Sequence, residues 1–90
     1  MTLEQAFGAA VKLRRLEAKL SQEELAEKAD MLGSALGRLE RGAVSTSLET
    51  VGRVAAALNT KPWALLWFAG QIQTGVRLEA LEPPPHIAGD

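Results

Sequence analysis

Residues 22–42 read QEELAEKADMLGSALGRLERG, and this stretch decides the fold. Ala26, Asp30 and Leu36 lie four, eight and fourteen residues after Gln22. The small side chain at position 26 lets two helices approach closely, and Asp is one of the few non-glycine types that adopts the positive φ of a tight turn. An aliphatic side chain at position 36 anchors the second segment in a core. The spacing therefore predicts two short helices joined by a tight turn.

Helical periodicity dominates the chain on both sides of this stretch. Ser21, followed three residues later by Glu24, predicts a capping box at the start of one helix. Gly42 is expected to end the next helix, and Pro62 suits the first turn of the last one. Thr46 or Ser47 would cap the helix between them. The expected helices cover residues 3–18, 22–29, 33–40, 48–58 and 63–69.

The pattern changes after Gly70. Val76, Leu78 and Ala80 alternate with their neighbours in a way that is closer to strand spacing than to helix spacing. Pro83–Pro85 then forbid a further helix and favour an extended tail. We therefore expect an all-α fold of five helices with a short C-terminal extended segment. It divides into a domain over residues 1–70 and an extension over residues 71–90.

Composition limits the class of protein. Ninety residues suffice for one domain with its own core. The chain has no cysteine, which excludes a disulfide framework, and its single histidine, His86, cannot form a zinc site alone. The longest strongly apolar run, Trp63–Ala69, is far shorter than the roughly 20 residues of a membrane span, and no export leader is evident. We expect a cytoplasmic protein with no metal, no cofactor and no membrane association.

The charge balance is unusual for a protein that binds nucleic acid. Ten Lys and Arg against eleven Asp and Glu give a net charge of −1, whereas DNA-binding domains usually carry a basic face. Residues 1–45 hold seven of each sign, so no basic half is hidden behind an acidic one. Contacts to phosphates would have to come from a local cluster such as Lys12, Arg14, Arg15, Lys19, Arg38 and Arg41.

Three segments carry a resemblance to a known family. They are AFGAAVKLRRLEAKLSQEELAEKA from Ala6, LERG ending at Gly42, and SLETVGRVAAALNTKPWALL ending at Leu66. LSQEELA and LERG, at their mutual spacing, are the most specific pieces. Over residues 6–66 the sequence resembles the Xre/Cro family of phage-repressor-type helix-turn-helix domains. The resemblance implies a five-helix phage-repressor-like fold and a transcription regulator that binds duplex DNA.

The same resemblance implies roles for individual residues. Gln22 takes the place of a residue that contacts a phosphate with help from the helix N-terminus, although an exposed first-turn residue would look the same. Arg15 and Glu40 match a structural pair that links the first helix to the third and fixes orientation more than it stabilises. Arg41 is a second candidate for a phosphate contact, and its helix-end position equally suits a solvated side chain.

The third helix offers few side chains that read bases. By the resemblance, Leu32, Gly33, Ser34 and Arg38 face the major groove. Among these only Arg38 can make a bidentate contact to a base, while Ser34 can make a short and weakly discriminating one. Leu32 lacks the side-chain acceptor of a good N-cap. Gly33 and Gly37 each cost on the order of 1 kcal/mol inside a helix, yet glycine also lets a backbone approach DNA closely.

The fifth helix is apolar nearly all round. Trp63 and Trp67 are one turn apart on the same face, and Phe68 has no obvious partner within the chain. Tryptophan is enriched at interface hot spots, and members of the family commonly dimerise on palindromic sites. We expect a dimer interface at these three residues, with Val76 and Leu78 in strands that pair across it. The alternative is that the segment after helix five folds back and covers the tryptophans.

Two functions follow from these observations. The first is a DNA-binding regulator that acts as a homodimer on a palindromic operator, with Gln22 and Arg41 on phosphates and Gly33, Ser34 and Arg38 at the bases. The second is a protein-binding module on the same fold, an antitoxin or antiactivator that sequesters a toxin or a transcriptional activator. The bare third helix, the acidic balance and the surplus aromatics motivate it. Neither is an enzyme, because no catalytic constellation appears.

Overall fold

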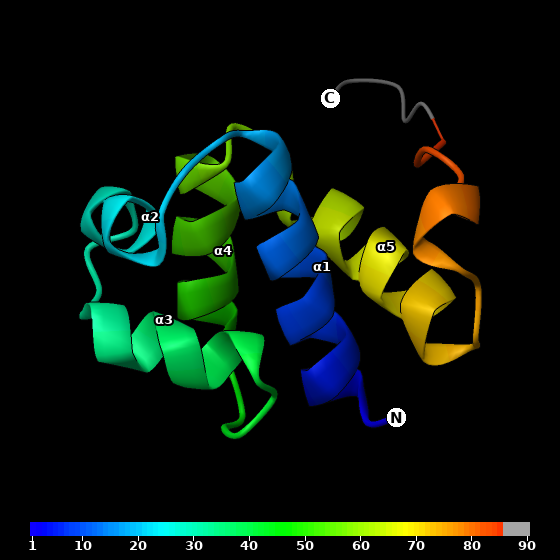
Figure 1. Ribbon diagram of the computed structural model, residues 1–90, viewed down its shortest axis with the longest axis horizontal. Helices are drawn as coiled ribbons and strands as arrows, with labels where there is room; N and C mark the ends of the chain where they lie inside the picture. The colour runs from blue at the N-terminus through cyan, green and yellow to red at the C-terminus, as the bar shows by residue number, and fades with distance from the viewer. Residues whose placement is uncertain (86–90) are drawn as a thin grey trace.

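The computed structural model describes residues 1–85, and these residues form helices without any strand (Figure 1). Figure 1 shows α1 in the middle, with α2, α3 and α4 on one side and α5 with the C-terminal segment on the other. The all-α prediction with five helices is therefore confirmed. The elements are α1 (Leu3–Glu17), α2 (Gln22–Lys28), α3 (Gly33–Glu40), α4 (Leu48–Ala57), α5 (Pro62–Gln73) and the 3-10 turn η1 (Leu78–Ala80).

Local side-chain caps explain where the helices begin. Ser21 Oγ accepts the backbone N–H of Glu24 at 3.0 Å, and Glu24 Oε1 accepts the backbone N–H of Ser21 at 2.9 Å. This is the predicted capping box, and its hydrogen bonds hold the pKa of Glu24 below its ordinary value. Ser47 caps α4 in the same manner. Asp30 has the expected positive φ, 56°, in the turn between α2 and α3.

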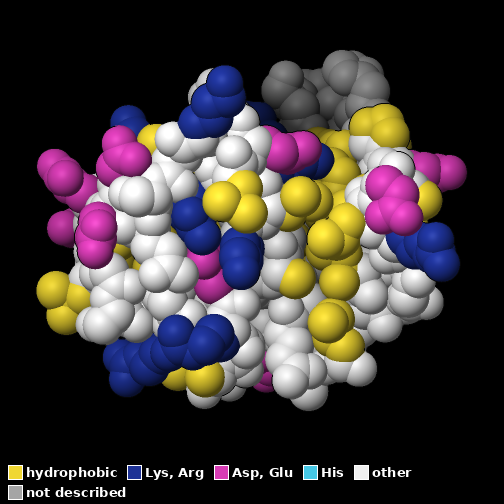
Figure 2. Space-filling model, viewed as in Figure 1, with side chains coloured by type: hydrophobic (Ala, Val, Ile, Leu, Met, Phe, Trp, Pro, Cys, Tyr) yellow, Lys and Arg dark blue, Asp and Glu magenta, His cyan; other side chains and the backbone are white. Residues whose placement is uncertain are grey.

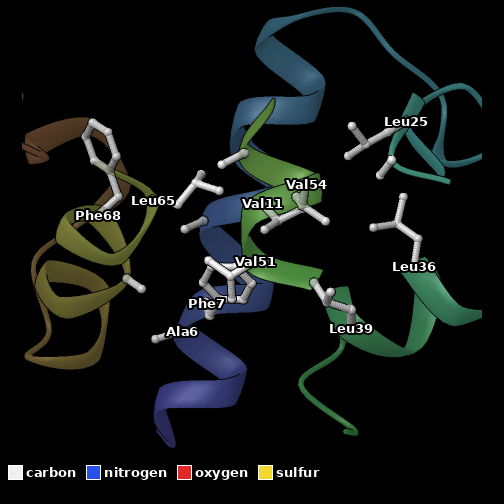
Figure 3. Packing of buried hydrophobic residues seen from close by; sticks show 14 of the residues in the cluster. Ala6, Phe7, Val11, Leu25, Leu36, Leu39, Val51, Val54, Leu65 and Phe68 are labelled. Atoms are coloured by element: carbon white, nitrogen blue, oxygen red, sulfur yellow. The ribbon is translucent and has the colours of Figure 1, made fainter. Parts of the chain in front are cut away.

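The hydrophobic core gathers side chains from all five helices (Figure 3). Leu36, the anchor expected from the sequence, is fully buried. Complete burial of one such aliphatic side chain is worth about 1.5–3 kcal/mol relative to leaving it in water. The core thus fixes α3 through its inner face and leaves the outer face free. The largest fully buried side chains are Leu25, Leu36, Leu65, Val11 and Val54.

Two glycines hold α1 close to the end of α3. A Cβ atom added to Gly8 would lie 2.4 Å from the carbonyl oxygen of Leu39 and 2.5 Å from that of Glu40. Gly42 ends α3 as predicted, with φ +70°, and a Cβ there would lie 2.5 Å from the Cα of Gln5. Both contacts are made by backbone atoms, which cannot move aside. The orientation of α3 on α1 therefore depends on these two positions having no side chain.

The C-terminal part differs from the prediction in two respects. Helix α5 continues to Gln73, past the end at residue 69 that the sequence predicts. The strand expected over Val76 to Leu81 is wrong, because Gly75, with φ 94°, reverses the chain and η1 follows. Backbone groups here find partners within the chain, so no second strand is needed. His86 and the rest of the predicted tail lie outside the described residues.

Phe68 does not belong to the exposed apolar face that the sequence of α5 predicts. The prediction that it has no partner within the chain is wrong: its side chain is buried in the core, and the Arg14 guanidinium lies 3.8 Å from its ring centroid. Trp67 is 40% exposed, and its Nε1 donates to the backbone oxygen of Glu82 at 3.3 Å. Trp63 is half-buried. The C-terminal segment therefore does fold back toward α5, and it leaves Trp67 partly open.

Candidate nucleic-acid interface

A shallow groove runs between the start of α2 and the outer face of α3. The five residues predicted to contact DNA, which are spread over positions 22 to 41, all lie along this groove. Two further residues, Glu23 and Gly37, complete the lining. Because α3 buries Leu36, Leu39 and Glu40 on its inner side, Ser34 and Arg38 are left exposed on the outer side. The groove is lined by Gln22, Glu23, Gly33, Ser34, Gly37, Arg38 and Arg41.

Two glycines of α3, Gly33 and Gly37, lie along the groove. A Cβ atom on Gly33 would meet only the Glu23 side chain, at 3.6 Å. A Cβ on Gly37 would lie 3.3 Å from Arg41 Nη1, the end of a flexible side chain, and 3.6 Å from Gln22 Oε1. Packing within the protein therefore does not require glycine at either position. Gly33, which is partly exposed, provides backbone that a ligand in the groove can approach closely, whereas Gly37 is buried beneath the side-chain ends of Gln22 and Arg41.

A buried network fixes one wall of this groove. Arg15 donates from Nε to Glu40 Oε2 at 2.7 Å and from Nη2 to Glu40 Oε1 at 3.0 Å, so the predicted structural pair is formed. Arg15 also donates to the backbone oxygen of Leu20 at 2.9 Å. The hydrogen bond to Glu40 raises the pKa of Arg15 above its ordinary value, so the guanidinium stays charged despite burial. The bidentate geometry holds α1 and α3 in a defined orientation.

Gln22 belongs to the same network, which no local sequence pattern indicates. Its Nε2 donates to Glu40 Oε1 at 2.9 Å, across 18 residues of sequence. A side-chain amide has two N–H donors, and this bond uses one of them. The second N–H donates to no group among the described residues, while Glu40 fixes the direction in which the amide points. Gln22 thus joins the start of α2 to the far end of α3.

Charges are unevenly distributed around the groove. Figure 2 shows acidic side chains gathered over α2 and Lys and Arg side chains along the lower edge, at α3. The basic cluster expected from the sequence is divided in the structure, because Arg15 is buried against Glu40 and Arg14 pairs with Glu17 at 2.7 Å. Arg38 and Arg41 remain at the groove, with Glu23 beside them. The local field there is positive on one side and negative on the other.

Over residues 1–85, no three His, Cys, Asp or Glu side chains come together in a way that could hold a metal ion. None of the helices within the same range is both long enough and apolar enough to pass through a membrane.

Comparison with known proteins identifies the class. Residues 11–64 match the family described as Helix-turn-helix, which covers more than half of the chain. The chain therefore belongs to the helix-turn-helix family of the Xre/Cro type, and its class is that of a non-enzymatic, DNA-binding transcription regulator. A comparison with curated proteins finds no significant match.

Solved structures of two regulators resemble this chain in both sequence and fold. The clp gene regulator ClgR from Corynebacterium glutamicum is 30% identical with a TM-score of 0.80, over 82% of this chain and 79% of ClgR. The restriction-modification controller protein C.AhdI from Aeromonas hydrophila is 34% identical with a TM-score of 0.67, over 68% of this chain and 92% of C.AhdI. A variant of the controller protein C.Esp1396I shares the fold at 20% identity, with a TM-score of 0.74 over 83% of this chain and 99% of that one.

Proposed function

We propose that this chain regulates transcription as a homodimer that binds a palindromic operator through the groove at α3. The observation that carries the proposal is the convergence of Gln22, Ser34, Arg38 and Arg41 on one groove along the outer face of α3. Its similarity to two gene-regulatory proteins supports the same conclusion. Such a regulator would act in the cytoplasm.

Some of these residues would contact phosphates and others would contact bases. Gln22 and Arg41 both line the groove. Their free amide N–H and guanidinium would contact phosphates and set the position of the protein along the duplex. Arg38 would donate two hydrogen bonds to O6 and N7 of a guanine, which is the strongest base contact available here. Ser34 would add a short contact to a neighbouring base, and Gly33 would let the backbone come close.

The outer surface of α5 supports the dimer part of the proposal. Leu66 and Trp67 are 39% and 40% exposed, and a Cβ added to Gly70 would meet no atom within 4 Å. Leu66 lines two adjoining hollows, one of which extends to the exposed Leu3 and Leu48. A continuous apolar surface of this kind suits an isologous interface between two copies. Trp63, Val76 and Leu78 would lie at its edges, while Phe68 is withdrawn into the core.

Selection from random duplex DNA tests the proposal directly. The parent protein should enrich a sequence with two inverted half-sites, and its affinity should fall steeply as salt rises because phosphate contacts release counterions. Arg38→Ala should weaken binding to the selected site by about 1–3 kcal/mol and relax the preference at one base pair of each half-site. Arg53→Ala, a change on α4 away from the groove, is the matched control. No enrichment at low salt would contradict the proposal.

A second function is favoured by one observation, the acidic surface of α2 that borders α3 (Figure 2). Such a surface repels phosphates, and it would suit a basic protein partner such as a toxin or a transcriptional activator. In that case the chain would form a stoichiometric protein complex. The two functions are separated by the selection experiment, since a sequestering module with no DNA site enriches no duplex.

A further inference from the structure

Leu32 occupies an unfavourable place at the start of α3. It is the N-cap residue, with φ −73° and ψ 144°, yet it makes no side-chain hydrogen bond to the first turn. The caps of α1, α2 and α4 are Thr2, Ser21 and Ser47, and each of these accepts such a bond. The Leu32 side chain is also 75% exposed to water. One residue therefore combines a missing cap with an apolar side chain held in solvent.

The surroundings of Leu32 direct it outward beside the groove. Met31, the preceding residue, is half-buried and packs against the core, while the following Gly33 has no side chain to cover its neighbour. Leu32 and Gly33 line a hollow that adjoins the groove at their shared residues Glu23 and Gly33. Arg38 follows six residues later. At about 1.5 Å of rise per residue, the two side chains stand roughly 9 Å apart along α3.

The chemistry of the major groove decides what Leu32 can contact there. Base edges in this groove present hydrogen-bond donors and acceptors together with a single apolar group, the C5-methyl of thymine. An aliphatic side chain gains nothing from a polar edge and would remove water from it without replacing the hydrogen bonds. If α3 lies along the major groove, a separation of about 9 Å exceeds one base step of about 3.4 Å. Leu32 and Arg38 therefore address different base pairs.

We propose that Leu32 is a specificity-determining residue that contacts the C5-methyl group of a thymine, at a base pair other than the one that Arg38 contacts. The inference rests on the proposed function and adds the identity of a second base in each half-site. It also explains why α3 begins with a residue that caps it poorly. The contact removes the exposed aliphatic surface from water only when the operator is bound.

Deoxyuridine substitution isolates this one methyl group. In the selected duplex each thymine is replaced in turn by deoxyuridine, which pairs identically but lacks the C5-methyl, and binding is followed by fluorescence anisotropy. At one thymine per half-site, the parent protein should lose about three- to fivefold in affinity per substitution, the factor expected for burial of one methyl group. Leu32→Ala should bind both duplexes equally. Leu16→Ala, another exposed leucine but on α1, should keep the parent's sensitivity.

The outcomes separate this inference from the proposed function. If the parent binds its selected site with no sensitivity to deoxyuridine at any thymine, or if Leu32→Ala keeps that sensitivity, the role of Leu32 is overturned while the DNA-binding function stands. If no duplex is enriched at all, both the role of Leu32 and the DNA-binding function are overturned. If Leu32→Ala binds DNA like the parent but loses a protein complex, Leu32 belongs to a protein-binding surface and the inference is overturned.

A capping variant gives an independent check. Leu32→Ser supplies the missing N-cap acceptor, so its melting temperature should rise by several degrees. Its affinity for the thymine duplex should nevertheless fall to that of Leu32→Ala. A variant that is more stable and still prefers thymine over deoxyuridine would show that the side chain at position 32 is not the reader.

Discussion

Glu40 lies at the centre of the buried network beside the groove. Its two carboxylate oxygens accept hydrogen bonds from Arg15 and from Gln22, so one side chain joins α1, α2 and α3. The pair with Arg15 is withdrawn from water, with side-chain exposures of 8% for Arg15 and 2% for Glu40. A buried charge that loses its partner is far more costly than an exposed one, because water cannot replace the missing interaction.

Removal of this charge should therefore destabilise the fold strongly. Glu40→Gln leaves the Arg15 guanidinium buried without a counterion, and we expect the free energy of unfolding to drop by about 3–5 kcal/mol. Glu17→Gln is the matched control, because Glu17 pairs with Arg14 on the exposed side of α1, and its effect should stay within about 0.5 kcal/mol. Urea denaturation at neutral pH measures both. Equal effects of the two substitutions would show that the buried pair has no special role.

At the scale of the elements, α3 combines two faces with different requirements. Its inner face is fixed by the close approach of Gly8 to the backbone of Leu39 and Glu40, whereas its outer face has glycines that no neighbour demands. Both Gly8 and Gly37 are buried helical glycines, so burial alone does not distinguish them. The distances from an added Cβ atom do, since one meets backbone and the other meets the ends of long side chains.

Alanine substitutions at these two glycines should change the free energy of unfolding in opposite directions. Gly8→Ala forces α1 away from α3, and we expect a loss of about 1–3 kcal/mol in the free energy of unfolding. Gly37→Ala needs only a small shift of the Arg41 side chain and gains helix propensity, so stability should rise by up to about 1 kcal/mol. Denaturant midpoints of the two variants test this. A stabilising Gly8→Ala would contradict the tight contact between α1 and α3.

The sequence predicted those elements whose signals are local. The capping box at Ser21 and Glu24 and the positive φ at Asp30 are confirmed because each depends on a few neighbouring residues. The strand over Val76 to Leu81 was wrong because alternation alone does not show whether a partner strand exists. Here Leu81 packs on the core instead, and the Glu82 backbone exchanges hydrogen bonds with the side chain of Gln71 at 2.8 and 3.0 Å.

The candidate site was predictable in its membership and not in its internal contacts. Resemblance to a family placed Gln22 and Arg38 in the same groove, and the structure brings them together. The hydrogen bond from Gln22 to Glu40 depends on how α2 crosses α3, which no short sequence pattern encodes. Phe68 was misassigned for the same reason, since its partner Arg14 is 54 residues away on α1.

The whole molecule presents two separate surfaces, the groove at α3 and the apolar surface of α5. Figure 1 places α3 and α5 on opposite sides of α1, so the groove and the apolar surface of α5 do not compete for space. The first would face DNA and the second a second copy of the chain. Since two copies are needed to occupy two half-sites, affinity for an operator depends on how well α5 holds the dimer together.

A charge placed on the outer face of α5 should dissociate this dimer. Leu66→Glu puts a carboxylate into the shared part of both apolar hollows, and we expect the dimer dissociation constant to rise at least about tenfold, with a parallel loss of operator affinity. Leu16→Glu, on an exposed position of α1, should leave both unchanged. Sedimentation equilibrium measures the association. A parent protein that stays monomeric at high micromolar concentration would contradict the dimer.

The separation of α3 into a buried inner face and an outer face along the groove has a consequence for protein engineering. Residues 33, 34, 37 and 38 can be exchanged without touching the inner residues Leu36, Leu39 and Glu40, which hold the helix in place. Recognition residues from another regulator could therefore be transplanted onto this scaffold as a cassette of four positions. The outer face of α3 makes this chain a suitable recipient, since Gly33, Ser34 and Arg38 are not buried in the core and only the flexible side-chain ends of Arg41 and Gln22 lie over Gly37.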